Sequence, residues 1–411
     1  MNSSPQPSLS GNRLMVVTTG RADFGLLHPL LRKLAGHPRF DLQLVVTGSH
    51  LSAPHGMTID VIKADPDLSI VGTVPMTPEE DQEGDICRAV ARGLEGFSAL
   101  MENLRPDAVL VLGDRYELWS VGLAAQLHRV PIIHLHGGEV TEGAIDEAVR
   151  HSLSKMAALH FPALPAYGQR LLRMGESPDR VHVVGALGMD AIREIPLLDP
   201  KALSASTGVD FGEPVALMTF HPVTLDDYAA GAGQVRAILS SLAKRGMRTL
   251  VTMPNADASG LRIYQMIQEW CEAHPGQFTL IKNLGQPRYL SAMKYAALMI
   301  GNSSSGIIEA VAFQLPVINI GDRQAGRFRT PNIIDCGYQP EEIENALSKA
   351  LSSAFRAEVA QLKSPYGEGN TAEKIIDVLA SIDFRDKDRW LKKKFFEGEP
   401  KSLLGNKAEG A

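Results

Sequence analysis

The sequence has 411 residues and only three cysteines, Cys87, Cys271 and Cys336, which lie far apart. Because no CxxC pair is present, we expect neither a disulfide framework nor a zinc knuckle, and the thiols are expected to be reduced. Positive charge is not in excess either, since the formal net charge is -6. This balance argues against a nucleic-acid groove. The composition is typical of a soluble globular protein, and the reduced thiols indicate a cytoplasmic one.

Long apolar runs are also missing, so no segment of the sequence is expected to cross a membrane. The opening residues, MNSSPQPSLSG, have neither the cationic start nor the apolar core of a secretory signal. We expect residues 1–12 to form a disordered tail. A chain of this length can form two domains, each with its own core.

In the first half, short β-rich runs alternate with helical patterns, which is typical of a parallel sheet covered by helices. The runs predict strands at 14–18, 42–47, 108–112, 130–134, 159–161 and 181–184. The helical patterns cover 26–34, 86–104, 118–128 and 145–158.

A polar, proline-containing passage at 196–214 interrupts this alternation, which then restarts. Further strands are predicted at 215–220, 249–252, 278–281, 298–301 and 316–320. We therefore predict an α/β protein with two doubly wound, Rossmann-type domains, 13–200 and 201–370, that face each other across a cleft. A last helix is predicted within 371–384, and a charged, solvated tail at 385–411.

Acids and histidines follow two neighbouring predicted strands. Asp114 begins one such group, HLHGGE (134–139) forms the second, and Asp146 opens a third shortly afterwards. Ligands of doubly wound sheets bind beyond the carboxyl ends of the strands, so we interpret the cluster as an active site for proton transfer. For any single residue, chance placement in a polar loop is the alternative.

Two histidines of this group, His134 and His136, alternate along the predicted strand and should share a face. Together with Glu139 they could mimic metal ligands, but their spacing is not specific for a metal. We favour proton transfer or structural hydrogen bonding, and we expect no metal and no cofactor.

A run of hydroxyls lies in the second half, where Asn302, Ser303, Ser304, Ser305 and Gly306 connect the strand 298–301 to a predicted helix at 307–313. Hydroxyls and backbone N–H groups at a helix N-terminus bind anions, and glycine permits close approach of a phosphate. Glu309 could accept hydrogen bonds from ribose hydroxyls. An ordinary helix cap is the alternative interpretation.

Three further turns carry groups suited to phosphate. Arg21 lies in TTGRADFG (18–25), which is neither a Walker loop nor a GxGxxG fingerprint. His221 follows the strand 215–220 and could bind phosphate or donate a proton, or could equally be a packed structural histidine. The loop 322–327 adds Arg323, with a solvated surface loop as the alternative.

The ordered series of motifs resembles the hydrolysing UDP-N-acetylglucosamine 2-epimerases of bacterial sialic-acid and legionaminic-acid synthesis. The resemblance extends from about residue 14 to about 381 and rests on TTGRADFG, VLGDRYE, HLHGGEVTEGAIDEAVRHSLSK, FHPVT, PNAD, IGNSSSGIIEA and INIGDRQAGR. It implies a GT-B architecture, UDP held mainly by the C-terminal domain, and a homodimer or homotetramer.

The resemblance also implies the reaction. A base removes the C2 proton of the sugar while UDP leaves from C1, and water then adds to the resulting 2-acetamidoglucal. The leading hypothesis is conversion of UDP-GlcNAc and water to UDP and N-acetylmannosamine. The alternative substrate is UDP-2,4-diacetamido-2,4,6-trideoxyglucose. A GT-B glycosyltransferase and a nucleotide-sugar-binding regulator are hypotheses of other classes.

Site roles follow from the same resemblance. The residues that match catalytic acids are Asp114 and Asp146, and His221 is kept as a further catalytic candidate. Those that match nucleotide-binding positions are Arg21, Ser303, Ser304, Ser305, Gly306 and Glu309, with His221 at the diphosphate. Asn302 and Arg323 are further UDP-binding candidates because of their places in the loops after the predicted strands. Sugar contacts are expected from Asp114, Arg115, Glu117, Glu147 and Arg150.

One departure from the family pattern concerns the second strand end. Many relatives have a catalytic glutamate where this chain has His136, within the HxHGGE form that resembles a hydrolysing subgroup. The resemblance leaves open whether His136 or Glu139 takes that role. We favour Glu139 as the acid or base and keep His136 beside it.

Overall fold

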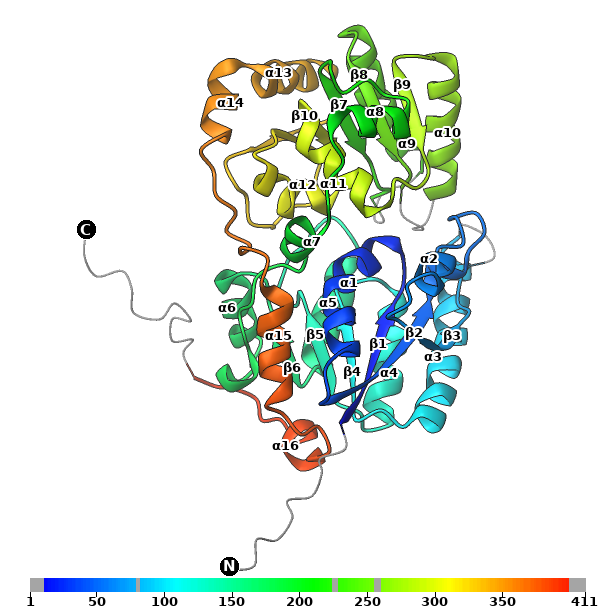
Figure 1. The fold of residues 1–411 in the computed structure, drawn as a ribbon, viewed down its shortest axis with the longest axis vertical. Coiled ribbons are helices and arrows are strands. Elements are labelled where there is room, and N and C mark those ends of the chain that lie inside the picture. Colours follow the sequence, from blue (N-terminus) through cyan, green and yellow to red (C-terminus); the bar gives the residue numbers. More distant parts are fainter. Residues whose placement is uncertain (1–10, 79–81, 224–227, 255–259, 399–411) are drawn as a thin grey trace, which may run out of the picture.

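The computed structural model describes residues 11–78, 82–223, 228–254 and 260–398. Two six-stranded sheets, one from each half of the chain, are arranged one above the other (Figure 1). The first contains β1 (Asn12–Thr18), β2 (Phe40–Thr47), β3 (Ile70–Val74), β4 (Ala108–Leu112), β5 (Ile132–Leu135) and β6 (Leu159–Phe161). The second contains β7 (Val215–Thr219), β8 (Arg248–Thr252), β9 (Phe278–Ile281), β10 (Leu298–Gly301), β11 (Val317–Ile320) and β12 (Ile333–Cys336).

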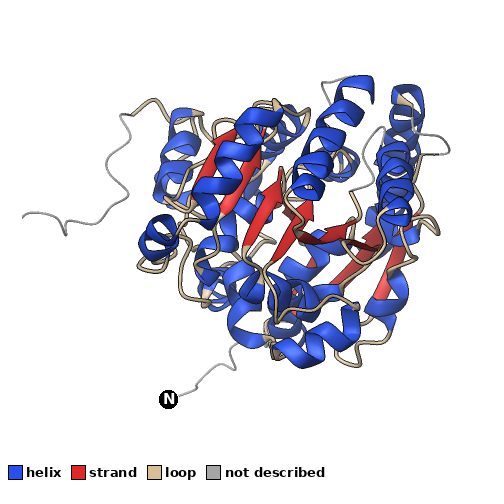
Figure 2. Cartoon of the chain, turned by 90° about the horizontal axis from the view of Figure 1, so that it is seen from above, coloured by secondary structure: helices blue, strands red, loops and turns tan. Residues whose placement is uncertain are grey.

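Helices cover both faces of each sheet (Figure 2). Those of the first half are α1 (Arg21–Ala35), α2 (Ile59–Lys63), α3 (Glu83–Leu104), α4 (Glu117–Leu127), α5 (Asp146–Met156) and α6 (Pro165–Arg173). The two connecting helices are α7 (Gly188–Glu194) and α8 (Pro200–Thr207). Those of the second half are α9 (Tyr228–Lys244), α10 (Gly260–Ala273), α11 (Gly285–Tyr295), α12 (Ser304–Ile308), α13 (Pro340–Leu351) and α14 (Ser353–Val359). The chain then returns to the first half through α15 (Thr371–Ala380) and α16 (Lys387–Leu391).

Both sheets are parallel and have the same doubly wound topology. The strand order is β3-β2-β1-β4-β5-β6 in the first and β12-β11-β10-β7-β8-β9 in the second. In each sheet the order reverses between the first and fourth strands of that half, at β1/β4 and at β7/β10. Ligand sites of such sheets lie at this reversal, beyond the carboxyl ends of the strands. The predicted pair of doubly wound units is confirmed, and the topology fixes where a site should lie.

The central strands are buried on both faces because helices cover both sides of each sheet. In β1, Leu14 and Val16 pack toward α1 and α15, whereas Met15 and Val17 pack toward α3 and α4. This burial explains the nearly continuous apolar runs in the sequence. Of the four edge strands, β3 and β12 are partly exposed and were not predicted, whereas β6 and β9 were.

Two other predicted elements differ from the structure. The strand expected at 181–184 is wrong, because only Val181 forms an isolated bridge, to His160. Gly185, at φ 98, turns the chain away there. The helix expected at 307–313 is instead two short pieces, α12 and a 3-10 turn Ala310–Phe313, which meet at Glu309.

The C-terminal segment packs on the first half, where α15 lies beside α1 (Figure 1). The prediction of a solvated tail from residue 385 is wrong for 385–398. Trp390 is buried, and Lys393 donates a hydrogen bond of 2.6 Å to the buried Glu176. The expected disordered tail also ends earlier than residue 12, since Asn12 begins β1 and its side-chain amide donates to the Ile382 carbonyl. Residues 1–10 and 399–411 lie outside the described ranges.

Across the described ranges, no helix combines the length and apolarity needed to span a bilayer.

Candidate active site

A cavity lies between the two halves, at the carboxyl ends of both sheets. It is bordered by residues that follow five strands: Arg21 after β1, Asp114 after β4, His136 after β5, His221 after β7 and Ser303 after β10. Four of these strands, β1, β4, β7 and β10, form the reversal points of the two sheets. The cavity is therefore where the topology places a ligand site.

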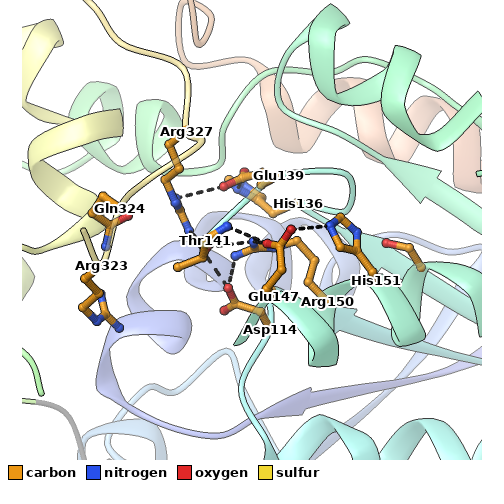
Figure 3. A network of polar contacts seen from close by, with 12 residues as sticks. Asp114, His136, Glu139, Thr141, Glu147, Arg150, His151, Arg323, Gln324 and Arg327 are labelled. Carbon is orange, nitrogen blue, oxygen red and sulfur yellow. Dashed lines mark hydrogen bonds and ion pairs between the residues drawn. The ribbon is translucent and has the colours of Figure 1, made fainter. Parts of the chain in front are cut away.

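On the side of the first half, the acid after β4 is paired with a fully buried arginine. Asp114 accepts a hydrogen bond from Arg150 Nη2, and Arg150 Nη1 donates to Thr141 Oγ1 at 2.8 Å (Figure 3). Arg327 Nη2, from the second half, lies 4.0 Å from the same Asp114 oxygen. Two guanidinium groups thus hold this carboxylate in place at the cavity wall.

The residues after β5 form a second ion-paired group. His136 Nδ1 lies 2.8 Å from Glu139 Oε1, and Arg327 Nη1 lies 2.9 Å from Glu139 Oε2 (Figure 3). Burial alone would raise the pKa of Glu139, but the Arg327 charge and the His136 hydrogen bond outweigh it and lower the pKa. Glu139 is thus an ionised carboxylate with both oxygens engaged.

The two histidines at this strand end do not share a face, contrary to the prediction. β5 ends at Leu135, and His134 is packed inside the first half, where its Nε2 donates to the Gly113 carbonyl at 2.8 Å. Burial lowers the pKa of His134 to about 3, so this ring is neutral. His136 instead borders the cavity. Within the described ranges, no three His, Cys, Asp or Glu side chains are arranged to hold a metal ion.

On the side of the second half, backbone and amide groups fix the strand ends. The Asn302 side chain accepts from His221 N at 2.7 Å and donates to His221 O at 2.8 Å, which ties the end of β10 to the end of β7. Ser303 caps α12 by accepting from Ser305 N. The Tyr289 hydroxyl is hydrogen-bonded to Ser303 and Ser305. This wall offers hydroxyls rather than ion pairs.

Glu309 lies at the junction of α12 and the following 3-10 turn and borders the cavity. Burial raises its pKa to about 7. The carboxylate packs so closely on Gly188, the first residue of α7, that a Cβ at Gly188 would overlap it. Because α12 has only five residues, a helix dipole contributes less to this wall than the sequence suggested.

Most of the predicted site residues meet at this cavity. Those that border it are Arg21, Asp114, Arg115, His136, Glu139, Asp146, Arg150, His221, Ser303, Ser304, Ser305, Glu309 and Arg323.

Four predicted contact residues do not border the cavity. Asn302 bonds to the backbone of His221, and Gly306 is packed against Val317. Glu117 is buried beside Gly48, and Glu147 accepts from Thr141 N at 2.6 Å. These residues support the walls of the site from behind.

Arg327 and Tyr289 are among the cavity residues that were not predicted from the sequence. Arg327 lies in the same loop as the predicted Arg323, and Tyr289 lies on α11. The cationic loop 322–327 was the available signal for Arg327. It could not show which arginine reaches the other half: Arg323 donates to the Asn302 carbonyl within its own half at 3.3 Å.

Comparisons with known proteins agree with this geometry. The profile of the family described as UDP-N-acetylglucosamine 2-epimerase matches residues 32–380. The GDP/UDP-N,N'-diacetylbacillosamine 2-epimerase (hydrolyzing) of Campylobacter jejuni is 37% identical over 85% of this chain and 90% of its own length. The UDP-N,N'-diacetylbacillosamine 2-epimerase (hydrolyzing) of Legionella pneumophila is 35% identical over 90% of this chain and 96% of its own.

Among solved structures, the UDP-GlcNAc 2-epimerase of Neisseria meningitidis bound to UDP-GlcNAc has a TM-score of 0.77 to this structure. The match covers 90% of this chain and 100% of that chain at 17% identity. It confirms the predicted GT-B-like fold. The chain thus belongs to the UDP-N-acetylglucosamine 2-epimerase family, as an enzyme of the hydrolysing UDP-sugar 2-epimerase type.

Proposed function

We propose that the protein converts UDP-2,4-diacetamido-2,4,6-trideoxyglucose and water to UDP and the free C2-epimeric sugar, a precursor of a nonulosonic acid. In the first step a base removes the C2 proton, the C–H electron pair forms the C1=C2 double bond, and the C1–O pair leaves with UDP. In the second step water adds its oxygen to C1, and a proton is delivered to the opposite face of C2. The observation that carries this proposal is the meeting of acids from one half with serine hydroxyls, a histidine and an arginine from the other at a single cavity.

The choice of sugar rests on the relatives. Both the Campylobacter and the Legionella proteins, at 37% and 35% identity, carry names that specify a diacetylbacillosamine nucleotide. UDP-GlcNAc, the leading expectation from the sequence, is the second candidate, because the family profile bears its name.

The second half is suited to the nucleotide. Ser303, Ser304 and Ser305 place hydroxyls along one wall, while Arg323 and His221 add groups that can face a diphosphate. Glu309, protonated or ionised near neutral pH, can accept hydrogen bonds from ribose hydroxyls. As UDP leaves, these groups would stabilise the charge that develops on the departing oxygen.

The first half is suited to the sugar. Asp114, Asp146, His136 and Glu139 are titratable groups at the same cavity, and epimerisation through a glycal requires proton transfer on two faces of C2. Arg150 and Arg327 hold two of these acids in fixed positions. Groups fixed in this way lose little orientation freedom during the reaction.

NMR of the reaction in D2O tests the proposal. We expect UDP, and a free sugar with inverted configuration and deuterium at C2, from the diacetamido nucleotide sugar, with a higher kcat/KM than for UDP-GlcNAc. Turnover of UDP-GlcNAc alone would overturn the choice of substrate. Transfer of intact sugar to an acceptor without deuterium at C2 would overturn the elimination and indicate a glycosyltransferase.

A further inference from the structure

His136 has three properties that set it apart from the other groups of the cavity. It has a left-handed backbone at φ 59, which costs energy for a residue with a side chain. Its side chain is 9% exposed and borders the cavity. Its Nε2 atom is buried and has no hydrogen-bond partner in the described structure. A strained backbone therefore holds an unpartnered ring nitrogen at the wall of the site.

The other ring nitrogen is fixed by Glu139. Since Glu139 is ionised and can only accept, His136 Nδ1 carries the hydrogen of the 2.8 Å contact. In the neutral imidazole, Nε2 then presents its lone pair. The other Glu139 oxygen accepts from Arg327 at 2.9 Å. The three side chains form a relay that ends in a basic nitrogen, as Figure 3 shows for their relative positions.

The relay crosses from one half of the protein to the other. Arg327 lies between β11 and β12 of the second sheet, whereas Glu139 and His136 follow β5 of the first. The loops that carry them are in direct contact: Glu142 N donates to the Ala325 carbonyl at 3.3 Å. At Gly326, φ 77, a Cβ would overlap Val140. The guanidinium reaches Glu139 because the two halves meet here.

Resting on the proposed elimination, we propose that His136 Nε2 is the base that removes the C2 proton, and that Glu139 and Arg327 are positioning residues. The proton moves to Nε2, the C–H electron pair forms the C1=C2 bond, and the C1–O pair departs with UDP. The imidazolium keeps its Nδ1–H bond to Glu139, whose own charge is balanced by Arg327. Because Arg327 belongs to the second half, the base is oriented only while the halves are together.

Glu139 is the competing candidate for the base, and the contacts argue against it. Both of its oxygens are already engaged, by His136 and by Arg327. Those same partners lower its pKa, which makes it a weak base for a carbon acid. The free lone pair belongs to His136.

The first test removes the imidazole without straining the chain. Glycine adopts a φ of 59 with less backbone strain than histidine does. His136→Gly is therefore expected to fold and to bind UDP as the unchanged protein does. We expect its rate of UDP release from the nucleotide sugar to fall about 10³-fold. Added imidazole, which can enter the space left in the cavity, should restore part of that rate.

The second test addresses Arg327. Arg327→Met should lower kcat about 10²-fold, with little change in KM, and should increase the primary isotope effect with substrate deuterated at C2. In the His136→Gly background, Arg327→Met should lower kcat only slightly further. The effects of two residues that act through one group are not additive. Arg329→Met is the matched control, since Arg329 lies in the same loop but pairs with Asp335 within its own half.

Three outcomes would overturn the assignment. One is an unchanged rate of UDP release in His136→Gly, and another is normal UDP release with accumulation of the glycal, which would place His136 in the hydration step. Full additivity of His136→Gly and Arg327→Met would show that Arg327 does not act through His136. If the unchanged protein releases no UDP from either nucleotide sugar, the proposed function itself fails instead.

Discussion

The two walls of the cavity hold their functional groups by different means. On the first half, buried ion pairs fix the groups: Arg150 holds Asp114, and Glu139 is held between His136 and Arg327. On the second half, hydroxyls and amides do this: Asn302 ties two strand ends together, and Tyr289 bonds to the serine run. The same doubly wound topology therefore carries two kinds of wall.

The two walls differ because, in the proposed function, the second would contact the diphosphate and the first would contact the sugar. A diphosphate brings its own charge, so hydroxyl and N–H donors suffice to bind it. A sugar carbon acquires charge only during the reaction, so the groups that act on it must be charged and oriented beforehand. Changes on the first wall should therefore affect kcat, and changes on the second should affect nucleotide affinity.

The largest effect is expected for Asp114→Asn. The amide keeps the shape but removes the acid and its charge from the cavity, so kcat should fall about 10³-fold while UDP affinity is retained. Steady-state kinetics measure kcat, and a calorimetric titration measures the affinity for UDP. Asp107→Asn, which changes an acid paired with Arg13 outside the cavity, is the control. Unchanged turnover in Asp114→Asn would remove Asp114 from the mechanism.

Next comes Arg150→Met, which tests whether the first wall depends on its buried cation. Arg150 is 1% exposed and bonds to Asp114 and Thr141. Removing one partner of a buried pair leaves the other without compensation, so the free energy of unfolding should fall by about 3 kcal/mol. Urea titration measures the free energy of unfolding. The control is Arg173→Met, which changes an exposed arginine on α6. Equal stability of the two variants would contradict the role of ion pairing.

How far the sequence predicts the structure depends on burial. Central strands such as β4 and β10 are recognisable because both faces are covered, which makes them continuous apolar runs. The edge strands β3 and β12 alternate with exposed positions or are only partly buried, so no such run marks them. The central strands and the edge strands β6 and β9 could thus be predicted, whereas the edge strands β3 and β12 could not.

In the candidate site, too, some residues could be predicted from the sequence and others could not. Asp114 and the serine run were predicted because each directly follows a strand end. Arg327 could not be distinguished from Arg323, because its reach across the cleft depends on the close packing of Gly326 against Val140. Contacts between halves depend on tertiary packing, which local sequence patterns do not report.

A pH experiment addresses the acid of the second wall. Burial raises the pKa of Glu309 to about 7, whereas a glutamate in an unfolded chain titrates near 4.3. Between these values the folded protein keeps a proton that the unfolded chain has released. The Glu309 contribution to stability is therefore present at low pH and is lost as the pH rises to about 7.

Glu309→Gln should remove this dependence. Relative to the unchanged protein, the variant should gain about 2 kcal/mol of unfolding free energy between pH 5 and pH 8, as measured by urea titration at both values. The comparison between the two proteins cancels the contributions of other titrating groups. If the unfolding free energies of the two proteins differed by the same amount at pH 5 and at pH 8, the raised pKa of Glu309 would be contradicted.

The smallest effect is expected for Ser304→Ala, on the hydroxyl wall. Ser304 borders the cavity, and a hydrogen bond from its hydroxyl to a charged phosphate oxygen contributes about 1.5 kcal/mol, so the UDP dissociation constant should rise about tenfold. kcat should stay unchanged, because the hydroxyl is not expected to take part in proton transfer. Ser353→Ala, on the exposed start of α14, is the control. If Ser304→Ala instead lowered kcat at unchanged UDP affinity, the second wall would act on the chemistry as the first does, and the division between the walls would be wrong.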